Sequence, residues 1–215
     1  MNPSEPIRID VVSDVVCPWC FIGKRQLEQA LQQWQLKHPQ AAAPEVVWHP
    51  FQLNPDLPAE GIAREAYLQR KFGRSDGAGM YDNVRRAAAA VGLNLNLEGI
   101  ARQPNTLAAH ALMHLAQQSG RQQQTAEALF NAYFIDGRDL TDDAVLTGIA
   151  ATAGLDAGQV QSTLADEALL KQVSARDRQA RDSGIGGVPF FIVNRKLAVS
   201  GAAGADHLLQ ALEQV

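Results

Sequence analysis

The hydrophobic pattern at the start of the chain predicts a strand, a helix and a second strand. Residues 7–12 are rich in β-branched side chains and alternate with polar ones at their start, which is typical of a strand. From Pro18 to Trp34 apolar residues recur at helical spacing, with proline in the first turn, where its missing N–H costs little. The run 46–53 predicts a second strand, and Pro50 should place it at a sheet edge or in a bulge. The chain therefore opens with a βαβ unit.

The pattern changes after Pro58 and favours helices over more than a hundred residues. Glycine and proline separate six segments of helical periodicity, at residues 62–72, 80–91, 105–118, 126–134, 142–153 and 159–182. Asn105, after Pro104, and the run 141–143 are typical helix N-caps. Because no convincing strand pattern interrupts this stretch, we expect it to be all-helical.

A β pattern returns after the glycine-rich run 184–189. Residues 190–193 and 197–200 flank the polar run 194–196 as a hairpin, and residues 205–212 predict a last helix. Short loops join the elements at each end of the chain, so both ends should share one sheet. The sequence thus predicts an α/β fold of the order βαβ, helices, ββα. We expect a split domain formed by residues 1–57 and 183–215, with residues 58–182 inserted as a helical domain.

Composition and charge narrow the class of protein. Hydrophobic residues make up 46% of the chain and charged residues 20%, which is typical of a soluble globular protein. The net charge of −4 lacks the basic excess that phosphate binding needs, so we expect no nucleic-acid partner. No apolar run approaches the roughly 18 residues that cross a bilayer. The first ten residues also lack the apolar region of a secretory signal. We therefore expect no membrane partner and a cytoplasmic location.

The two cysteines indicate the chemistry. Cys17 and Cys20 are the only cysteines, and their Cys-x-x-Cys spacing is typical of a redox pair or of half a metal site. Cys17 ends the predicted strand-to-helix loop, so the helix N-terminus should moderately lower its pKa, while Cys20 lies within the first turn. We therefore predict that Cys17 attacks disulfides and that Cys20 resolves the mixed disulfide.

A zinc site is the alternative for these cysteines, and it needs two further ligands. His110 and His114, one helical turn apart, are the only paired candidates. About ninety residues separate them from Cys20, far outside the usual spacing of zinc-binding motifs. We therefore expect no metal, and we expect the two histidines to face solvent.

Three segments carry a resemblance to a known family. The run 13–24, SDVVCPWCFIGK, is followed by PFQLNP at 50–55 and by GVPFFIV at 187–193. Together they resemble the FrnE-like branch of the DsbA family of thiol-disulfide oxidoreductases, in the same order along nearly the whole chain. The resemblance implies a thioredoxin-like fold interrupted by helices, disulfide exchange activity, and a cis peptide bond before Pro189 next to the sulfurs.

The resemblance and the residues together suggest how a substrate is bound. Cis bonds occur almost only before proline, and Gly186 and Gly187 should let the backbone approach the cysteines. Val188 would then offer its N–H and C=O to a bound peptide in the manner of a strand. The predicted substrate-binding residues are those between the cysteines, those of this loop, and two that resemble a region facing the active site in relatives: Pro18, Trp19, Val188, Pro189, Asn105 and His110.

Two departures from the family pattern affect the expected chemistry. Thioredoxin-like proteins often carry a buried acid six residues before the first cysteine, where this chain has Val11, and Asp10 points to the opposite face. Proton transfer to Cys20 must then use Asp14, water or another group. Trp19 stands where strongly oxidising relatives carry histidine, so we expect a weaker oxidant.

The function predicted is a protein disulfide oxidoreductase that acts on protein or small-molecule thiols and disulfides, with no cofactor beyond glutathione as a redox partner. The main alternative is a glutathione-dependent isomerase or transferase of the 2-hydroxychromene-2-carboxylate isomerase or kappa type. Those relatives generally carry serine where this chain has Cys17. A chaperone without redox activity is a third reading. The sequence leaves the substrate, the net direction of electron flow and the formation of a homodimer open.

Overall fold

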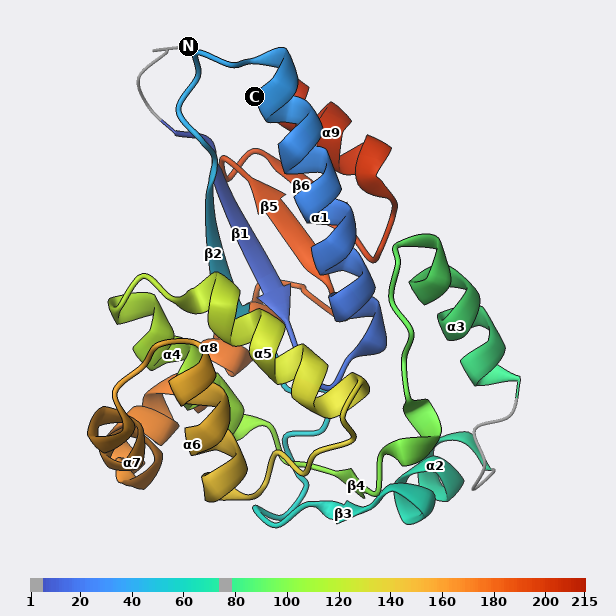
Figure 1. Cartoon of the computed structure of the whole chain (residues 1–215), viewed down its shortest axis with the longest axis vertical. Helices are drawn as coiled ribbons and strands as arrows, with labels where there is room; N and C mark the ends of the chain where they lie inside the picture. The colour runs from blue at the N-terminus through green and yellow to red at the C-terminus, as the bar shows by residue number, and fades with distance from the viewer. Residues whose placement is uncertain (1–5, 74–78) are drawn as a thin grey trace.

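The computed structural model describes residues 6–73 and 79–215, and within them the long strands form one mixed four-stranded sheet of order β2-β1-β5-β6 (Figure 1). Strand β1 (Arg8–Ser13) runs parallel to β2 (Glu45–Pro50) and antiparallel to β5 (Phe190–Val193). Strand β6 (Leu197–Ser200) completes the predicted hairpin. The edge position predicted for β2 is confirmed, although β2 ends at Pro50 rather than at residue 53.

Two helices from opposite ends of the chain pack side by side against the sheet. They are α1 (Pro18–Lys37) and the shorter α9 (Ala205–Glu213), which contact one another (Figure 1). Alternation along β1 sends Val11 into the main core and Val12 toward a small cluster with Phe51 and Ile185 on the other face. The two ends of the chain therefore build one sheet, as predicted, and α1 and its cysteines lie directly against it.

Most of the described residues between β2 and β5 are helical. The helices are α2 (Arg64–Phe72), α3 (Met80–Ala90), α4 (Leu107–Gln118), α5 (Gln122–Phe134), α6 (Asp143–Thr152), α7 (Ala157–Ala165) and α8 (Glu167–Asp182). The N-cap predicted before α6 is confirmed, since the Asp142 carboxylate accepts a hydrogen bond from the N–H of Ala144. The predicted α/β fold with a helical insertion is thus confirmed.

The insertion differs from its prediction in three places. Residues 159–182 form two helices rather than one, because the carboxylate of Asp166 accepts from the N–H groups of Ala168 and Leu169 and so starts α8. Residues 62–72 begin with a two-residue strand, β3 (Ile62–Ala63), paired with β4 (Arg102–Gln103), so the insertion is not all-helical. A 3-10 turn, which was not predicted, spans Leu97–Gly99.

The hydrophobic core runs without interruption from the sheet into the helical insertion. Phe21 of α1 stacks on Phe130 of α5 with ring centroids 5.0 Å apart, and it lies 6.2 Å from the ring of Phe134. The division into a domain of residues 1–57 and 183–215 and an inserted domain of residues 58–182 therefore remains a prediction. Residues 1–5 and 74–78 lie outside the described part of the chain. In the described residues no helix is both long and apolar enough to cross a membrane.

Candidate active site

The two cysteines lie where β1 leads into α1. The N–H of Cys17 donates to the carbonyl of Asp14 at 3.1 Å, which closes a tight turn after the strand. Cys17 is the N-cap residue in an extended conformation, and Pro18 occupies the first helical position. The N–H of Cys20 donates to the carbonyl of Cys17 at 3.0 Å. Both sulfurs therefore belong to the first turn of α1, and Cys17 is nearer to the helix N-terminus, as predicted.

The sulfurs differ from their neighbour Trp19 in exposure. Cys17 and Cys20 are free thiols that are 4% and 1% exposed, whereas the side chain of Trp19 is 37% exposed. Burial raises the pKa of the Cys20 thiol well above its ordinary value, and the adjacent Cys17 raises it further. Cys20 therefore keeps its proton until a group inside the protein or a change in its surroundings removes it.

The loop before β5 reaches the sulfur of Cys17. The Val188–Pro189 peptide bond is cis, and the Cys17 thiol donates to the carbonyl of Val188 with 3.6 Å between sulfur and oxygen. The predicted cis bond and its proximity to the sulfurs are confirmed. Val188 is half-buried, so part of this loop borders the surface beside the sulfurs.

A glycine makes the close approach possible, but it is not one of the two predicted. At Gly23 of α1 an added Cβ would lie 2.9 Å from Cγ of Pro189 and 3.1 Å from Cζ of Phe191. At Gly186 and Gly187 nothing lies within 4 Å of an added Cβ. The role predicted for Gly186 and Gly187 is therefore wrong, because the contact between helix and loop is made on the α1 side.

A buried acid lies in the turn that precedes the cysteines. Asp14 is fully buried, and its Oδ2 accepts from the N–H of Leu53 at 2.7 Å. Its Oδ1 is 3.3 Å from Nε2 of His110. Asp10 is engaged elsewhere: burial by itself opposes its ionisation, but hydrogen bonds from Arg8 and His49 outweigh this and hold the pKa of Asp10 below its usual range.

The two histidines of α4 have different surroundings. His110 is only 4% exposed and its Nε2 is 3.2 Å from the carbonyl oxygen of Phe51, so the expectation that it faces solvent is wrong. His114 is half-buried, and its ring nitrogens contact Arg176 and Gln118. Among residues 6–73 and 79–215 no group of three or more histidine, cysteine, aspartate or glutamate side chains is arranged to hold a metal ion.

Asn105 connects α4 to a neighbouring loop. The N-cap residue of α4 is Thr106, but Oδ1 of Asn105 accepts from the N–H of Leu107 at 3.0 Å. Its Nδ2 donates to the carbonyl of Leu57 at 2.7 Å. Asn105 therefore ties the start of α4 to the chain after β2, and its role in binding a substrate remains a prediction.

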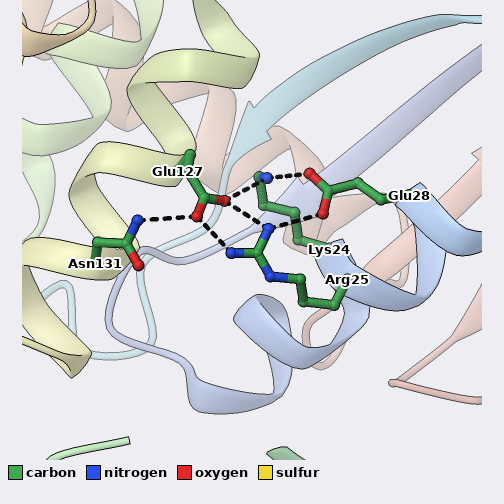
Figure 2. A network of polar contacts seen from close by, with 5 residues as sticks. All are labelled: Lys24, Arg25, Glu28, Glu127 and Asn131. Atoms are coloured by element: carbon green, nitrogen blue, oxygen red, sulfur yellow. Dashed lines mark hydrogen bonds and ion pairs between the residues drawn. The ribbon is translucent and has the colours of Figure 1, made fainter. Parts of the chain in front are cut away.

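A charged cluster joins α1 to α5, and sequence reasoning missed it (Figure 2). Lys24 is only 3% exposed, and its ammonium group lies 2.6 Å from the carboxylate of Glu127. Arg25 donates to the same carboxylate, and Glu28 accepts from both cations. Burial alone would raise the pKa of Glu127, but hydrogen bonds from Arg25 and Lys24 outweigh it and hold this pKa below its usual range. No local pattern signals the pair Lys24 and Glu127, which are 103 residues apart.

Comparison with known proteins gives a family and a fold. A family model described as DSBA-like thioredoxin domain matches residues 8–213. A probable DsbA oxidoreductase from Streptomyces coelicolor, of known structure, is 35% identical, with 97% of this chain and 89% of that chain covered and a TM-score of 0.84. The uncharacterized protein YwbO of Bacillus subtilis is 27% identical over 96% of each chain. The cytosolic disulfide reductase DsbM from Pseudomonas aeruginosa, solved with GSH, has a TM-score of 0.69 at 17% identity, with 96% of this chain and 98% of that chain covered.

Proposed function

The chain belongs to the family of DSBA-like thioredoxin domains, and on this premise we propose that it exchanges disulfides with protein or small-molecule thiols through Cys17 and Cys20. One observation carries the proposal. The two cysteines are free thiols in the first turn of α1, and Cys17 lies at the helix N-terminus with its sulfur against the Val188–Pro189 loop. This arrangement supplies an attacking sulfur, a resolving sulfur and a backbone segment beside them.

The surroundings of the two thiols support a division of labour. The unpaired N–H groups and the dipole of a helix N-terminus stabilise negative charge at the N-cap, which is the position of Cys17. Cys20 lies deeper, and burial raises the pKa of its thiol. Cys17 therefore attacks the substrate disulfide, and Cys20 then displaces the substrate thiolate from the mixed disulfide.

The proposed substrate site surrounds the sulfur of Cys17. The Trp19 side chain is exposed at its rim and offers an apolar surface, while Pro18 shapes the turn between the cysteines. The half-buried Val188 would pair its backbone with an extended segment of a substrate, and Pro189 fixes the direction of that backbone. We assign all four residues to substrate binding.

The proposal includes a location, a redox partner and a branch of the family. Both cysteines serve in the active pair, so the chain has no structural disulfide to lose in a reducing compartment. We therefore assign it to the cytoplasm, with glutathione as redox partner and no other cofactor. DsbM, a cytosolic disulfide reductase solved with GSH, is a precedent for this combination on the same fold. The motif around Cys17 and Cys20 favours the FrnE-like branch.

Reduction of insulin by dithiothreitol tests the proposal. The protein should accelerate precipitation of the insulin B chain, and Cys17→Ser should abolish the acceleration because the attacking sulfur is gone. With Cys20→Ala the mixed disulfide has no resolving thiol, so partners should accumulate on Cys17 and be released by reductant. A Cys17→Ser variant as active as the wild type would contradict the proposal.

The same assay separates the isomerase alternative. A glutathione-dependent isomerase needs one group to activate the glutathione thiol, whereas disulfide exchange needs two sulfurs that cycle together. A wild-type protein that ignores insulin but rearranges a chromene carboxylate only with glutathione would favour the isomerase. The retained Cys17 argues against that outcome, since isomerase-type relatives generally carry serine there.

A further inference from the structure

The face of the sheet away from α1 carries a groove that the exchange reaction proposed above does not use. The groove has a volume of about 520 Å³ and lies between β1 and α8. Arg8, Asp10 and Val12 form its β1 side, and Val12 belongs to the small cluster on the opposite side of the sheet from the main core. Arg176 and Ala180 form its α8 side. We call this site the β1–α8 groove.

The β1–α8 groove is more basic than the chain as a whole. It is lined by Arg8, Arg176 and Arg195. Asp10 is the single carboxylate among the described residues of its lining, whereas the whole chain has a net charge of −4. Asp10 is already engaged, since its carboxylate accepts from Arg8 and lies 2.7 Å from Nε2 of His49. The positive charges of Arg176 and Arg195 are therefore not balanced within the groove.

Arg176 is held beside the groove by a neutral partner. Its guanidinium donates to Nδ1 of His114 on the neighbouring helix α4, with 3.1 Å between the two nitrogens. Burial lowers the pKa of His114, and the charge of Arg176 lowers it further, so this histidine is neutral at physiological pH. The contact therefore fixes the direction of the guanidinium and leaves its positive charge available to an anionic ligand.

Arg195 is held at the end of the groove where β1 begins. It lies with Asn194 in the turn between β5 and β6, and both residues have a left-handed backbone, with φ of 56° and 48°. The side-chain oxygen of Asn194 accepts from the N–H of Arg8 at 2.8 Å, and the N–H of Asn194 donates to the carbonyl of Arg8 at 2.8 Å. The turn is thus anchored to β1, and it carries the exposed side chain of Arg195.

The floor of the groove is apolar and leads toward the sulfur site. Val12, Ile185 and Ile192 line it. Val12 and Ile185 belong to the small cluster against which Val188 packs, and the carbonyl of Val188 contacts the sulfur of Cys17. Strand β1 lines the groove over four residue steps, a rise of about 13 Å. A chain bound beside Val188 therefore has an apolar path, about four extended residues long, that ends among the arginines.

An apolar floor between uncompensated arginines fits a protein segment better than a bare anion or a nucleic acid. An inorganic anion would use the arginines and leave the apolar floor exposed. A nucleic acid is bound by neutralising many phosphates, and two uncompensated arginines in an acidic chain fall short of that. An extended peptide that carries apolar and acidic side chains uses both features of the groove. The charge and the floor together indicate an acidic peptide.

We propose that the β1–α8 groove binds an extended acidic segment of the protein whose disulfide is exchanged, with carboxylates at Arg176 and Arg195 and apolar side chains on the floor. The inference rests on the proposed function, because the bound segment belongs to the substrate that Cys17 attacks. Binding involves no covalent change, and it raises the local concentration of the substrate disulfide at the sulfur site. The groove thus adds a preference for acidic protein substrates, which the cysteine motif does not specify.

Reduction of peptide disulfides by the pre-reduced full chain tests this preference. Each substrate is the symmetric disulfide of a peptide that contains a cysteine, a flexible spacer of about six residues and a tract of alternating leucine and glutamate. The reference substrate has glutamine in place of glutamate, and self-quenching aminobenzoyl labels report both rates. At low salt the wild type should react at least about fivefold faster with the glutamate peptide, because complementary charges raise association rates about tenfold or more.

The double variant Arg176→Gln, Arg195→Asn should reduce this preference to less than about twofold. Glutamine can still donate to His114, and asparagine tolerates a left-handed backbone, so the variant loses charge but keeps the contact and the turn. Its rate with the glutamine peptide should stay within about twofold of the wild type. The matched control, Arg86→Gln with Arg178→Gln, removes the same charge at exposed arginines outside the groove lining and should keep the preference.

An equal preference in the wild type and the groove variant overturns the proposal, and so does a control variant that loses the preference as completely. Two other results would assign the groove to a different ligand and also overturn it. The first is a preference that inorganic phosphate abolishes at an ionic strength at which chloride does not, which indicates a small anion. The second is a wild-type dimer, measured by light scattering, that is a monomer in the groove variant. A wild type that reduces neither peptide refutes the proposed function itself.

Discussion

Helix α1 is held on two flanks by different physical interactions. On the flank toward β5, Gly23 lets the helix touch Pro189 and Phe191, and no charge takes part in this contact. On the flank toward α5, Lys24 and Arg25 pair with the carboxylate of Glu127 (Figure 2). Gly23 and Lys24 are neighbours in sequence, so one turn of α1 makes both the contact with β5 and the ion pair with α5.

The two flanks teach which interaction sets geometry and which holds parts together. Contact between atoms is repulsive over a few tenths of an ångström, so the Gly23 flank fixes how far the Val188–Pro189 loop stands from Cys17. Attraction between charges changes slowly with distance, so the Glu127 flank holds the insertion on α1 but tolerates small shifts. We therefore expect added side-chain volume at Gly23 to lower the catalytic rate. Loss of the charge of Glu127 should instead lower the free energy of unfolding.

Gly23→Ala is expected to have the largest effect, and on activity. The new Cβ must push Pro189 or Phe191 away, and a displacement of about 1 Å in an active site can cost about a hundredfold in rate. Insulin reduction should fall at least about tenfold. The free energy of unfolding should fall by no more than about 2 kcal/mol, because overpacking costs about 1–3 kcal/mol and alanine regains about 1 kcal/mol of helix propensity over glycine.

Gly186→Ala is the matched control, since nothing lies within 4 Å of its added Cβ and its backbone is not left-handed. Its rate of insulin reduction should equal that of the wild type. If Gly23→Ala retains the full rate, or if both variants lose it together, the contact flank does not set the geometry of the sulfur site.

Glu127→Ala is expected to have the next largest effect, and on stability. It removes an ion-pair partner of Lys24, whose side chain is 3% exposed, while the Glu127 side chain itself is 30% exposed. Breaking a fully buried pair costs about 3–5 kcal/mol and an exposed one about 0–1, so an intermediate loss of about 2 kcal/mol follows. Urea unfolding measures it. Glu28→Ala, at the more exposed carboxylate of the same cluster, should cost less than about 1 kcal/mol.

A pH series checks that the effect of Glu127 is electrostatic. Its pKa in the folded protein lies below the ordinary value of 4.5, so its charge stabilises the fold fully above that pH. The contribution is lost as pH falls through the folded-state pKa. The stability difference between wild type and Glu127→Gln should therefore be constant near neutral pH and shrink below about pH 4.5. A difference that grows on acidification would contradict the assignment.

Local patterns predicted the two sulfurs and the loop on the β5 side of α1 much better than the ion pairs on its α5 side. The periodicity of residues 7–12 and 18–34 identified β1 and α1, and the Cys-x-x-Cys and Val-Pro motifs located both sulfurs and the loop beside them. These features depend on residues close in sequence or on a known motif. The role of Gly23 was not predicted, because a glycine inside a helix has no sequence signal for what packs against it.

Features formed between distant segments were not predictable in the same way. Lys24 with Glu127 and Asp14 with His110 are pairs that only the packing of the insertion brings together. Strands β3 and β4 have two residues each, too few for the alternation of apolar and polar side chains that identifies a strand in a sequence. The break at Asp166 did have a signal, an aspartate before an acidic first turn, but the apolar periodicity on both sides concealed it.

Glu213→Ala is expected to have the smallest effect, and it isolates burial as the variable. At the far end of α1, Lys37 and His38 pair with Glu213 of α9, at 3.4 Å and 3.0 Å. Like the Glu127 cluster, this one joins two basic side chains from α1 and its C-cap to one carboxylate of a packed helix, but these basic side chains are 57% and 41% exposed. Hydrogen bonds from His38 and Lys37 hold the pKa of Glu213 below its usual range, yet solvent screens the pairing.

Urea unfolding of Glu213→Ala should show a loss of at most about 0.5 kcal/mol. A loss equal to that of Glu127→Ala would mean that burial of Lys24 does not strengthen the flank toward α5, and that any carboxylate paired with α1 stabilises the fold to the same extent.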